Sequence, residues 1–183
     1  TEGNALHAGA FLTRLYKDEL LTFDPEALRW RWDLARIAAA PITDNVVEML
    51  AQRLEALPVA ARSLLQLGAC IGGSFSRAAL ALDAADAESD AGLSAALGIA
   101  VAEGFLLPQG DAFVFAHDRL QQAAYSTLDD ATRKRHHAQL GRLLQARAAA
   151  EVSIFELTGH LNQASELLGA DERLKLCELN LQA

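Results

Sequence analysis

The strongest constraint on this chain is its choice of aliphatic residues. Its 183 residues include 37 alanines and 32 leucines but only six valines and five isoleucines. Alanine and leucine are strong helix formers, whereas β-branched residues favour strands. The chain is therefore predicted to fold as a mainly α protein with little sheet.

Charge and cysteine content narrow the class of protein. The formal net charge is −8, and the two cysteines, Cys70 and Cys177, show no C-x-x-C spacing. This disfavours a disulfide or zinc scaffold. No apolar run reaches the roughly 18 residues of a membrane span, and no signal segment opens the chain. We expect a cytoplasmic protein without membrane insertion.

The two ends of the sequence predict a segment of a larger protein. The chain begins at Thr1 without an initiator Met, and Ala183 lies inside a predicted helix. Any catalytic machinery of the parent protein is then expected outside these residues.

The first part of the chain predicts helices and a small β-hairpin. Apolar residues recur at helical spacing over 6–20. Residues 29–33, R-W-R-W-D, alternate polar and apolar after the turn-forming Asp24-Pro25, which predicts a hairpin over 21–33. Trp30 and Trp32 are interpreted as packing residues rather than as a nucleic-acid stacking surface. A helix capped by Thr43-Asp44 follows.

The middle of the chain predicts a winged helix over 58–128. Pro58 opens a helix that Gly72-Gly73 closes, a short helix follows Ser76, and a third spans the 90s. Two short strands then flank Gln109-Gly110-Asp111. Helices followed by such a hairpin are typical of a winged helix.

Charge argues against DNA as the partner of this winged helix. Residues 78–118 contain no Lys or Arg and seven Asp or Glu. A duplex reader needs basic residues on its recognition helix and wing. A DNA-binding transcription regulator is therefore the weakest reading, and protein or nucleotide docking is favoured.

The last part, 129–183, predicts a linking helix and the first TPR-like α-hairpin of a helical repeat array. The linking helix carries the basic run Arg133-Lys134-Arg135. His136 and His137, which follow, project about 100° apart and are interpreted as solvent-exposed. Gly169 is predicted to close the next helix.

One stretch carries a family resemblance. Residues 113–125, F-V-F-A-H-D-R-L-Q-Q-A-A-Y, resemble the F-x-F-x-H-D-R-[VL]-Q-Q-A-A-Y segment of the STAND-type signalling ATPases of bacterial Ser/Thr kinase, ATPase and sensor histidine kinase hybrids. Residues 41–48, P-I-T-D-N-V-V-E, and 160–162, H-L-N, resemble further segments in the same order. Residues 1–16 resemble its G-G-N-P-F-F helix, with departures at Glu2 and at 5–7.

The resemblance implies the end of an AAA+ lid over 1–57, the winged helix over 58–128, and the start of helical repeats over 129–183. ATP or ADP with Mg would bind an upstream ATPase core, so this segment would itself be non-catalytic and hold no cofactor. In related switch ATPases the histidine of a His-Asp pair reaches the β-phosphate. His117 and Asp118 are the matching residues here, and Gly3 and Asn4 match a lid contact.

Other readings of these residues stay open. His117 and Asp118 could form a purely structural helix start in which Asp118 is the N-cap. A metal hydrolase is disfavoured because no further His or Asp ligands accompany the pair. The competing function is a protein-interaction scaffold in which no nucleotide touches His117. The expected partners are the upstream ATPase core, the downstream repeats and other proteins.

Overall fold

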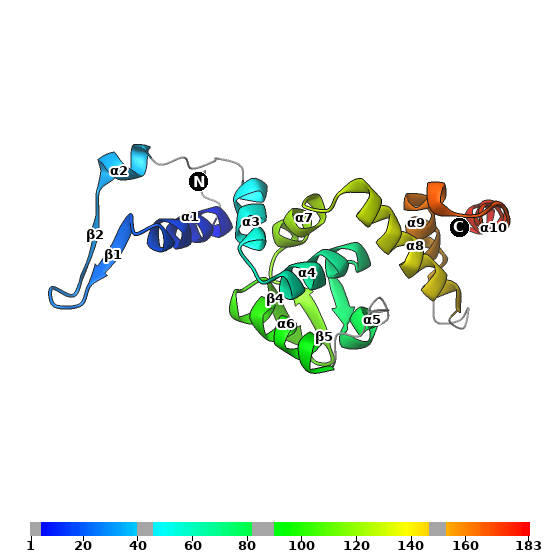
Figure 1. Cartoon of the computed structure of the whole chain (residues 1–183), viewed down its shortest axis with the longest axis horizontal. Coiled ribbons are helices and arrows are strands. Elements are labelled where there is room, and N and C mark those ends of the chain that lie inside the picture. Colours follow the sequence, from blue (N-terminus) through cyan, green and yellow to red (C-terminus); the bar gives the residue numbers. More distant parts are fainter. Residues whose placement is uncertain (1–4, 40–45, 82–89, 147–152) are drawn as a thin grey trace. The chain divides into compact units, whose positions relative to one another are not determined.

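The computed structural model describes residues 5–39, 46–81, 90–146 and 153–183. It divides into two compact units, Thr1–Arg53 and Leu54–Ala183 (Figure 1). The described part is mainly helical with two small antiparallel sheets, which confirms the predicted fold class. The predicted cap at Thr43-Asp44 lies outside the described residues.

The first unit contains a helix, a β-hairpin and a short helix, followed by most of a further helix. These are α1 (Ala5–Lys17), β1 (Leu21–Asp24), β2 (Arg29–Trp32), α2 (Leu34–Ala39) and α3 (Val46–Glu55). The hairpin has the predicted antiparallel form, with Phe23 opposite Trp30. At its turn, Asp24 Oδ1 accepts hydrogen bonds from the backbone N–H groups of Glu26 and Ala27, both at 3.0 Å. This Asx turn reverses the chain.

The two tryptophans of the hairpin are not core residues. Trp30 is 49% exposed and Trp32 59% exposed, so their interpretation as packing residues is wrong. Trp30 meets the rings of Tyr16 and Phe23 edge to face, with centroids 5.9 Å and 5.3 Å apart. These contacts leave about half of the indole exposed.

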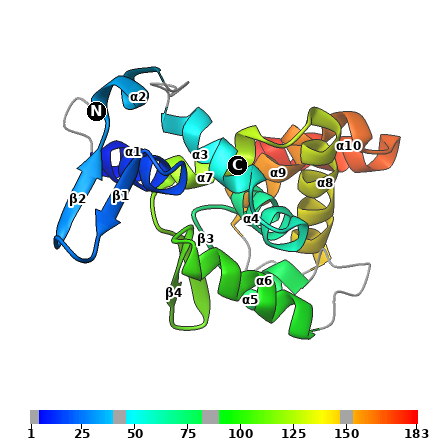
Figure 2. The ribbon, with the colours of Figure 1, turned by 60° about the vertical axis from the view of Figure 1, so that its left-hand side comes forward.

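The second unit begins with a helical layer packed on a three-stranded sheet (Figure 2). Its elements are α4 (Val59–Ile71), β3 (Ser74–Ser76), α5 (Arg77–Ala81), α6 (Asp90–Ala102), β4 (Leu106–Gln109), β5 (Ala112–Phe115) and α7 (Asp118–Ser126). The strand order is β3-β5-β4, all antiparallel. Strand β3 is only three residues long and was not predicted. Helix α4 and the predicted short helix after Ser76 are both confirmed.

A close contact fixes β3 against α4. A Cβ at Gly68 would lie 2.6 Å from the ring of Phe75, so only glycine lets the strand approach the helix this closely. Phe75 is buried and meets Phe115 of β5 edge to face, with ring centroids 5.7 Å apart. This packing holds β5 in place, and β5 leads directly into α7.

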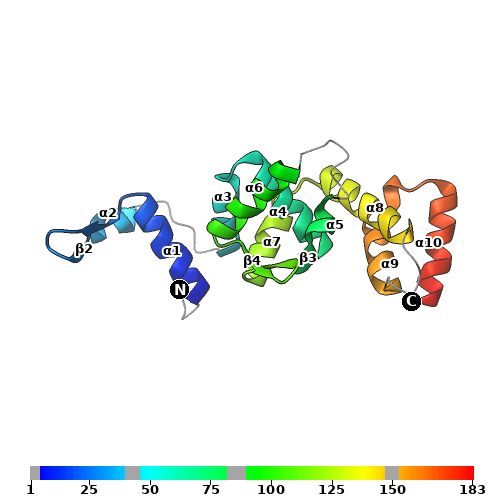
Figure 3. The ribbon, with the colours of Figure 1, turned by 90° about the horizontal axis from the view of Figure 1, so that it is seen from below.

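Three long helices complete the second unit (Figure 3). They are α8 (Asp130–Ala146), α9 (Ile154–Gln163) and α10 (Ala170–Gln182), with a 3-10 turn over Ser165–Leu167. Helices α8 and α9 pack closely, since a Cβ at Gly141 would lie 2.4 Å from Leu161. Gly169 begins α10 and does not close α9, which ends at Gln163, so the predicted boundary is wrong. The carboxylate of Glu172 accepts from Gly169 N at 2.9 Å.

Within the described ranges, every helix is too short or too polar to cross a lipid bilayer.

Candidate functional site

The predicted sensor residue His117 lies between β5 and α7. It is the N-cap of α7, with extended backbone angles (φ −158°, ψ 148°), and its Nδ1 accepts a hydrogen bond from Arg119 N at 3.1 Å. The side chain is 44% exposed. Phe115 at the end of β5 and the inner face of α7 are buried, so packed residues hold the backbone on both sides of an imidazole that lies at the surface.

Asp118 is the first residue of α7, and His117 is the N-cap. The alternative prediction, that Asp118 caps this helix in a purely structural pair, therefore placed the cap one residue too late. Oδ1 of Asp118 also accepts from Arg119 N, at 2.8 Å, and lies in contact with His117 Nδ1. The two side chains therefore share one backbone donor. Asp118 is 80% exposed, and its negative charge suits the positive end of the α7 dipole.

The tautomer of His117 sets what the other imidazole nitrogen, Nε2, can do. When Nδ1 accepts from Arg119, a neutral ring carries its hydrogen on Nε2, whereas when Nδ1 donates to Asp118, Nε2 of a neutral ring is an acceptor. In the first tautomer Nε2 is able to donate. Nε2 of His117 has no hydrogen-bond partner among the described residues. The group can therefore donate to an incoming acceptor such as a phosphate oxygen.

Gly3 and Asn4, the residues matched to a lid contact, lie outside the described residues. In the part of the chain that the structure describes, no three His, Cys, Asp or Glu side chains gather as a metal site would require.

A second histidine cluster was missed by the sequence analysis. His137 of α8 is buried and not solvent-exposed, which corrects the earlier interpretation. Its Nε2 lies 3.0 Å from the hydroxyl of Tyr125 on α7, and its Nδ1 lies 2.8 Å from Nδ1 of His160 on α9. His160 is also buried. These three side chains, which we call the Tyr-His-His row, join three consecutive helices.

Burial shifts the acidity of this row. It lowers the pKa of His137 to about 4, and repulsion from a proton on His160, from Arg133 and from a proton on His136 lowers it further. Burial likewise lowers the pKa of His160, against the opposing charge of Glu156. It raises the pKa of Tyr125. Both imidazoles are therefore neutral at pH 7.

The helical spacing of their neighbours could have revealed the buried histidines. His137 shares a face with Leu140, Gly141 and Leu144, which lie three, four and seven positions further on. His160 likewise follows Leu157 by three positions and precedes Leu161. A histidine inside such an apolar stripe is a buried residue.

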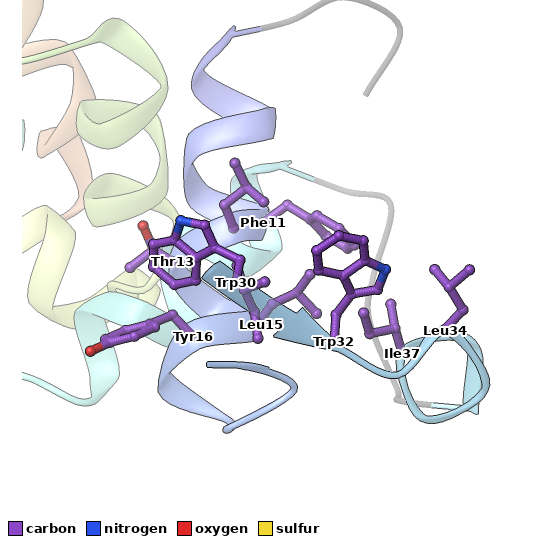
Figure 4. Close-up of a pocket in the computed structure, with 10 residues that line it drawn as sticks. Phe11, Thr13, Leu15, Tyr16, Trp30, Trp32, Leu34 and Ile37 are labelled. Atoms are coloured by element: carbon purple, nitrogen blue, oxygen red, sulfur yellow. The ribbon is translucent and has the colours of Figure 1, made fainter. Parts of the chain in front are cut away.

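The first unit contains an apolar pocket of about 800 Å³ (Figure 4). It lies between α1, the hairpin and α2, with the two indoles on one side. It is lined by Phe11, Leu12, Thr13, Leu15, Tyr16, Leu21, Trp30, Trp32, Leu34 and Ile37. Large exposed aromatic surfaces of this kind are typical of binding sites.

Comparison with known proteins shows that the chain is similar in sequence to a signalling kinase. It is 26% identical, over 239 aligned residues that include the whole chain, to "Hybrid signal transduction histidine kinase G" of Dictyostelium discoideum. The chain spans 7% of the length of that protein. No family model and no solved structure matches the chain. The similarity supports a relation to signal transduction kinases.

Proposed function

We propose that this chain is a non-catalytic regulatory segment of an ATP-dependent signal-transduction protein related to protein kinases. In this proposal residues 58–128 form a winged helix that closes on the nucleotide site of an upstream AAA+ ATPase core of the STAND type. The winged helix then relays the state of the nucleotide to helical repeats that begin with α9 and α10. The protein acts in the cytoplasm.

The observation that carries the proposal is the free donor of His117. A half-exposed imidazole held at a helix start by a backbone hydrogen bond is placed to meet a phosphate. ADP in the core would be that ligand, and closure would be a population shift between two domain arrangements. The similarity to a signalling kinase supports the wider role.

The test uses the parent protein and separates sensing from capping. His117→Ala removes both the imidazole and the N-cap, whereas His117→Asn removes the imidazole but keeps a good N-cap. Sensing predicts that both variants release ADP faster or signal constitutively. Normal ADP retention in His117→Asn would contradict a nucleotide contact and leave His117 with a capping role alone.

A specific observation favours a second candidate, the protein-interaction scaffold. The apolar pocket of the first unit carries two half-exposed indoles, and tryptophan is enriched where partners bind. In this reading Trp32→Ala in the parent abolishes partner capture while ADP affinity stays unchanged. In the sensing reading the same variant leaves the nucleotide-dependent signal intact.

Nucleic acid is not proposed as a partner. In the described part of 78–118 the charged residues are Asp90, Glu103, Asp111 and Asp118, all acidic. They would repel the phosphate backbone of a duplex.

A further inference from the structure

The Tyr-His-His row is the feature of this molecule that the proposed function leaves unused. It lies where α9, the first helix of the terminal hairpin, packs on α8. One hydrogen bond of the row joins Tyr125 of α7 to His137 of α8, and a second joins His137 to His160 of α9. Because buried polar groups cost free energy when they lose a partner, these hydrogen bonds favour one arrangement of the three helices.

The facing nitrogens set a limit on how many protons the row can hold. His137 Nδ1 and His160 Nδ1 lie 2.8 Å apart, so exactly one hydrogen fits between them. A neutral pair and a singly protonated pair both keep that hydrogen bond. A second proton places two N–H groups and two positive charges against each other, and the bond is lost.

The packing around the row prevents a small adjustment. Leu161, next to His160, is 1% exposed and lies so close to Gly141 that a Cβ there would clash at 2.4 Å. Interiors packed this closely respond as units rather than by gradual deformation. Separation of the two rings therefore requires α9 to move away from α8.

Charged and titratable groups from each packed helix act on the row. On α8, Arg133 and His136 disfavour a proton on His137. On α9, Glu156 favours a proton on His160. The groups that act on Tyr125 are Cys70 of α4 and Arg133 and Asp130 of α8. The cationic neighbours and burial outweigh the single carboxylate near His160, so both rings hold protons less readily than in water.

We propose that the Tyr-His-His row is a proton-operated latch that holds the α9–α10 hairpin against α8 when both imidazoles are neutral and releases it when both are protonated. The latch does not depend on a nucleotide contact by His117. It makes the position of the terminal hairpin sensitive to mild acidification.

The direction of the effect follows from proton binding. The pKa of each ring is lower in the closed form than its ordinary value of 6.5, so the open form binds more protons as the pH falls below 6.5. For His137 this range extends down to about pH 4. The closed form is fully favoured above pH 6.5 and weakens as the pH falls through this range. For His137, with a pKa of about 4, the opening equilibrium rises about 20-fold from pH 7 to pH 5.

The test is hydrogen exchange of the 183-residue chain at pH 7 and pH 5, expressed as protection relative to the intrinsic rate. The amides of α9 and α10 are expected to lose protection by about 20-fold. The amides of α4, which contains no histidine, serve as the internal reference for global unfolding and are expected to open at a higher free energy than those of α9 at pH 5. Equal opening free energies in α4 and α9 at both pH values would overturn the latch, since both helices would then report global unfolding alone.

Two variants and a titration complete the test. His160→Asn can still hydrogen-bond His137 but cannot titrate, so it is expected to remove the share of the protection loss in α9 that comes from His160, while the share from His137 remains. His136→Gln, the control next to His137, removes only the weakest of the charged neighbours that act on His137 and is expected to keep most of the protection loss. An unchanged pH response in His160→Asn would overturn the latch.

Should His160→Asn fail to fold, nitrogen NMR of the wild-type histidines decides. Two rings that are neutral at pH 7 and titrate together with the loss of α9 protection support the latch. A ring of the pair that titrates near pH 6.5 while α9 stays protected overturns it.

Discussion

His117 and His137 both meet helix α7, yet their surroundings are opposite. His117 stands at the first turn, 44% exposed, with one nitrogen bonded to the backbone and the other open. His137 lies beside the last turn, 6% exposed, with both nitrogens bonded to side chains of other helices. The first histidine can meet a ligand, and the second can report only on the packing of its own unit. The same residue type is therefore half-exposed at one end of the helix and buried between helices at the other.

The largest expected effect tests the packing around the buried histidines, where α9 contacts α8. Leu161→Ala, next to His160, is expected to lower the free energy of unfolding by about 3 kcal/mol, because it opens a cavity in a tightly packed site. Urea denaturation followed by circular dichroism measures the change. Leu181→Ala makes the same substitution at a side chain that is 90% exposed and should cost less than about 0.5 kcal/mol. Equal costs would show that the α8–α9 contact is not a core.

The second effect is the response to acid. Because the pKa of buried His137 is about 4 and that of the unfolded chain 6.5, the unfolded state binds more protons between these values. Stability is expected to fall by about 2 kcal/mol from pH 7 to pH 5 through this one group. The measurement is the difference in pH dependence between the wild type and His137→Phe, which cannot titrate. Parallel curves for the two proteins would mean that the pKa of His137 is the same in the folded and unfolded states, which would contradict the prediction.

A smaller effect is expected at the exposed histidine. His117→Ala removes the N-cap of α7 and should lower the free energy of unfolding by about 1 kcal/mol. His117→Asn should restore most of this loss, because asparagine is a good N-cap. Thermal unfolding at pH 7 gives the free energy of unfolding of both variants. A loss near that of Leu161→Ala would place His117 in the core packing and refute the contrast.

The smallest effect concerns an ion pair at the surface. Arg142 of α8 donates to both carboxylate oxygens of Glu172 on α10, and the pKa of Glu172 is lowered to about 2, chiefly by that contact. Its contribution is present above about pH 4.5 and is lost as the pH falls towards 2, so it is constant between pH 5 and pH 7. Glu172→Gln should lower the melting temperature less than any change above, and less still in high salt. Lys175→Gln on the same helix is the control. A larger fall in melting temperature for Lys175→Gln than for Glu172→Gln would contradict a stabilising Arg142–Glu172 ion pair.

Much of the fold followed from local patterns in the sequence. The helix opened by Pro58 and closed by Gly72, the hairpin around Asp24 and the two strands around Gly110 all rest on residues whose own backbone preferences fix the turn. Such signals act over a few positions and need no distant partner. They were therefore predictable.

The errors have a different cause. Gly169 was predicted to end a helix and instead begins one, because glycine is favoured at both positions and only Glu172, three residues later, selects the second. Strand β3 forms because β5 offers it an edge and Gly68 leaves room for Phe75. Each outcome depends on a partner that the local sequence does not specify.

The candidate site residues also include one that was predictable from local sequence and a group that was not. His117 was found from a sequence string, since both it and Asp118 act on a backbone group one or two residues away. The Tyr-His-His row escaped because its members meet across three helices.

By itself, the sequence determined that this chain is mainly helical, where most of its turns lie, and that a His-Asp pair opens α7. Only the tertiary structure decided which side chains the buried histidines hydrogen-bond and which tryptophans are exposed. Backbone preference is a property of each residue, whereas burial and hydrogen bonding between helices depend on which faces pack together.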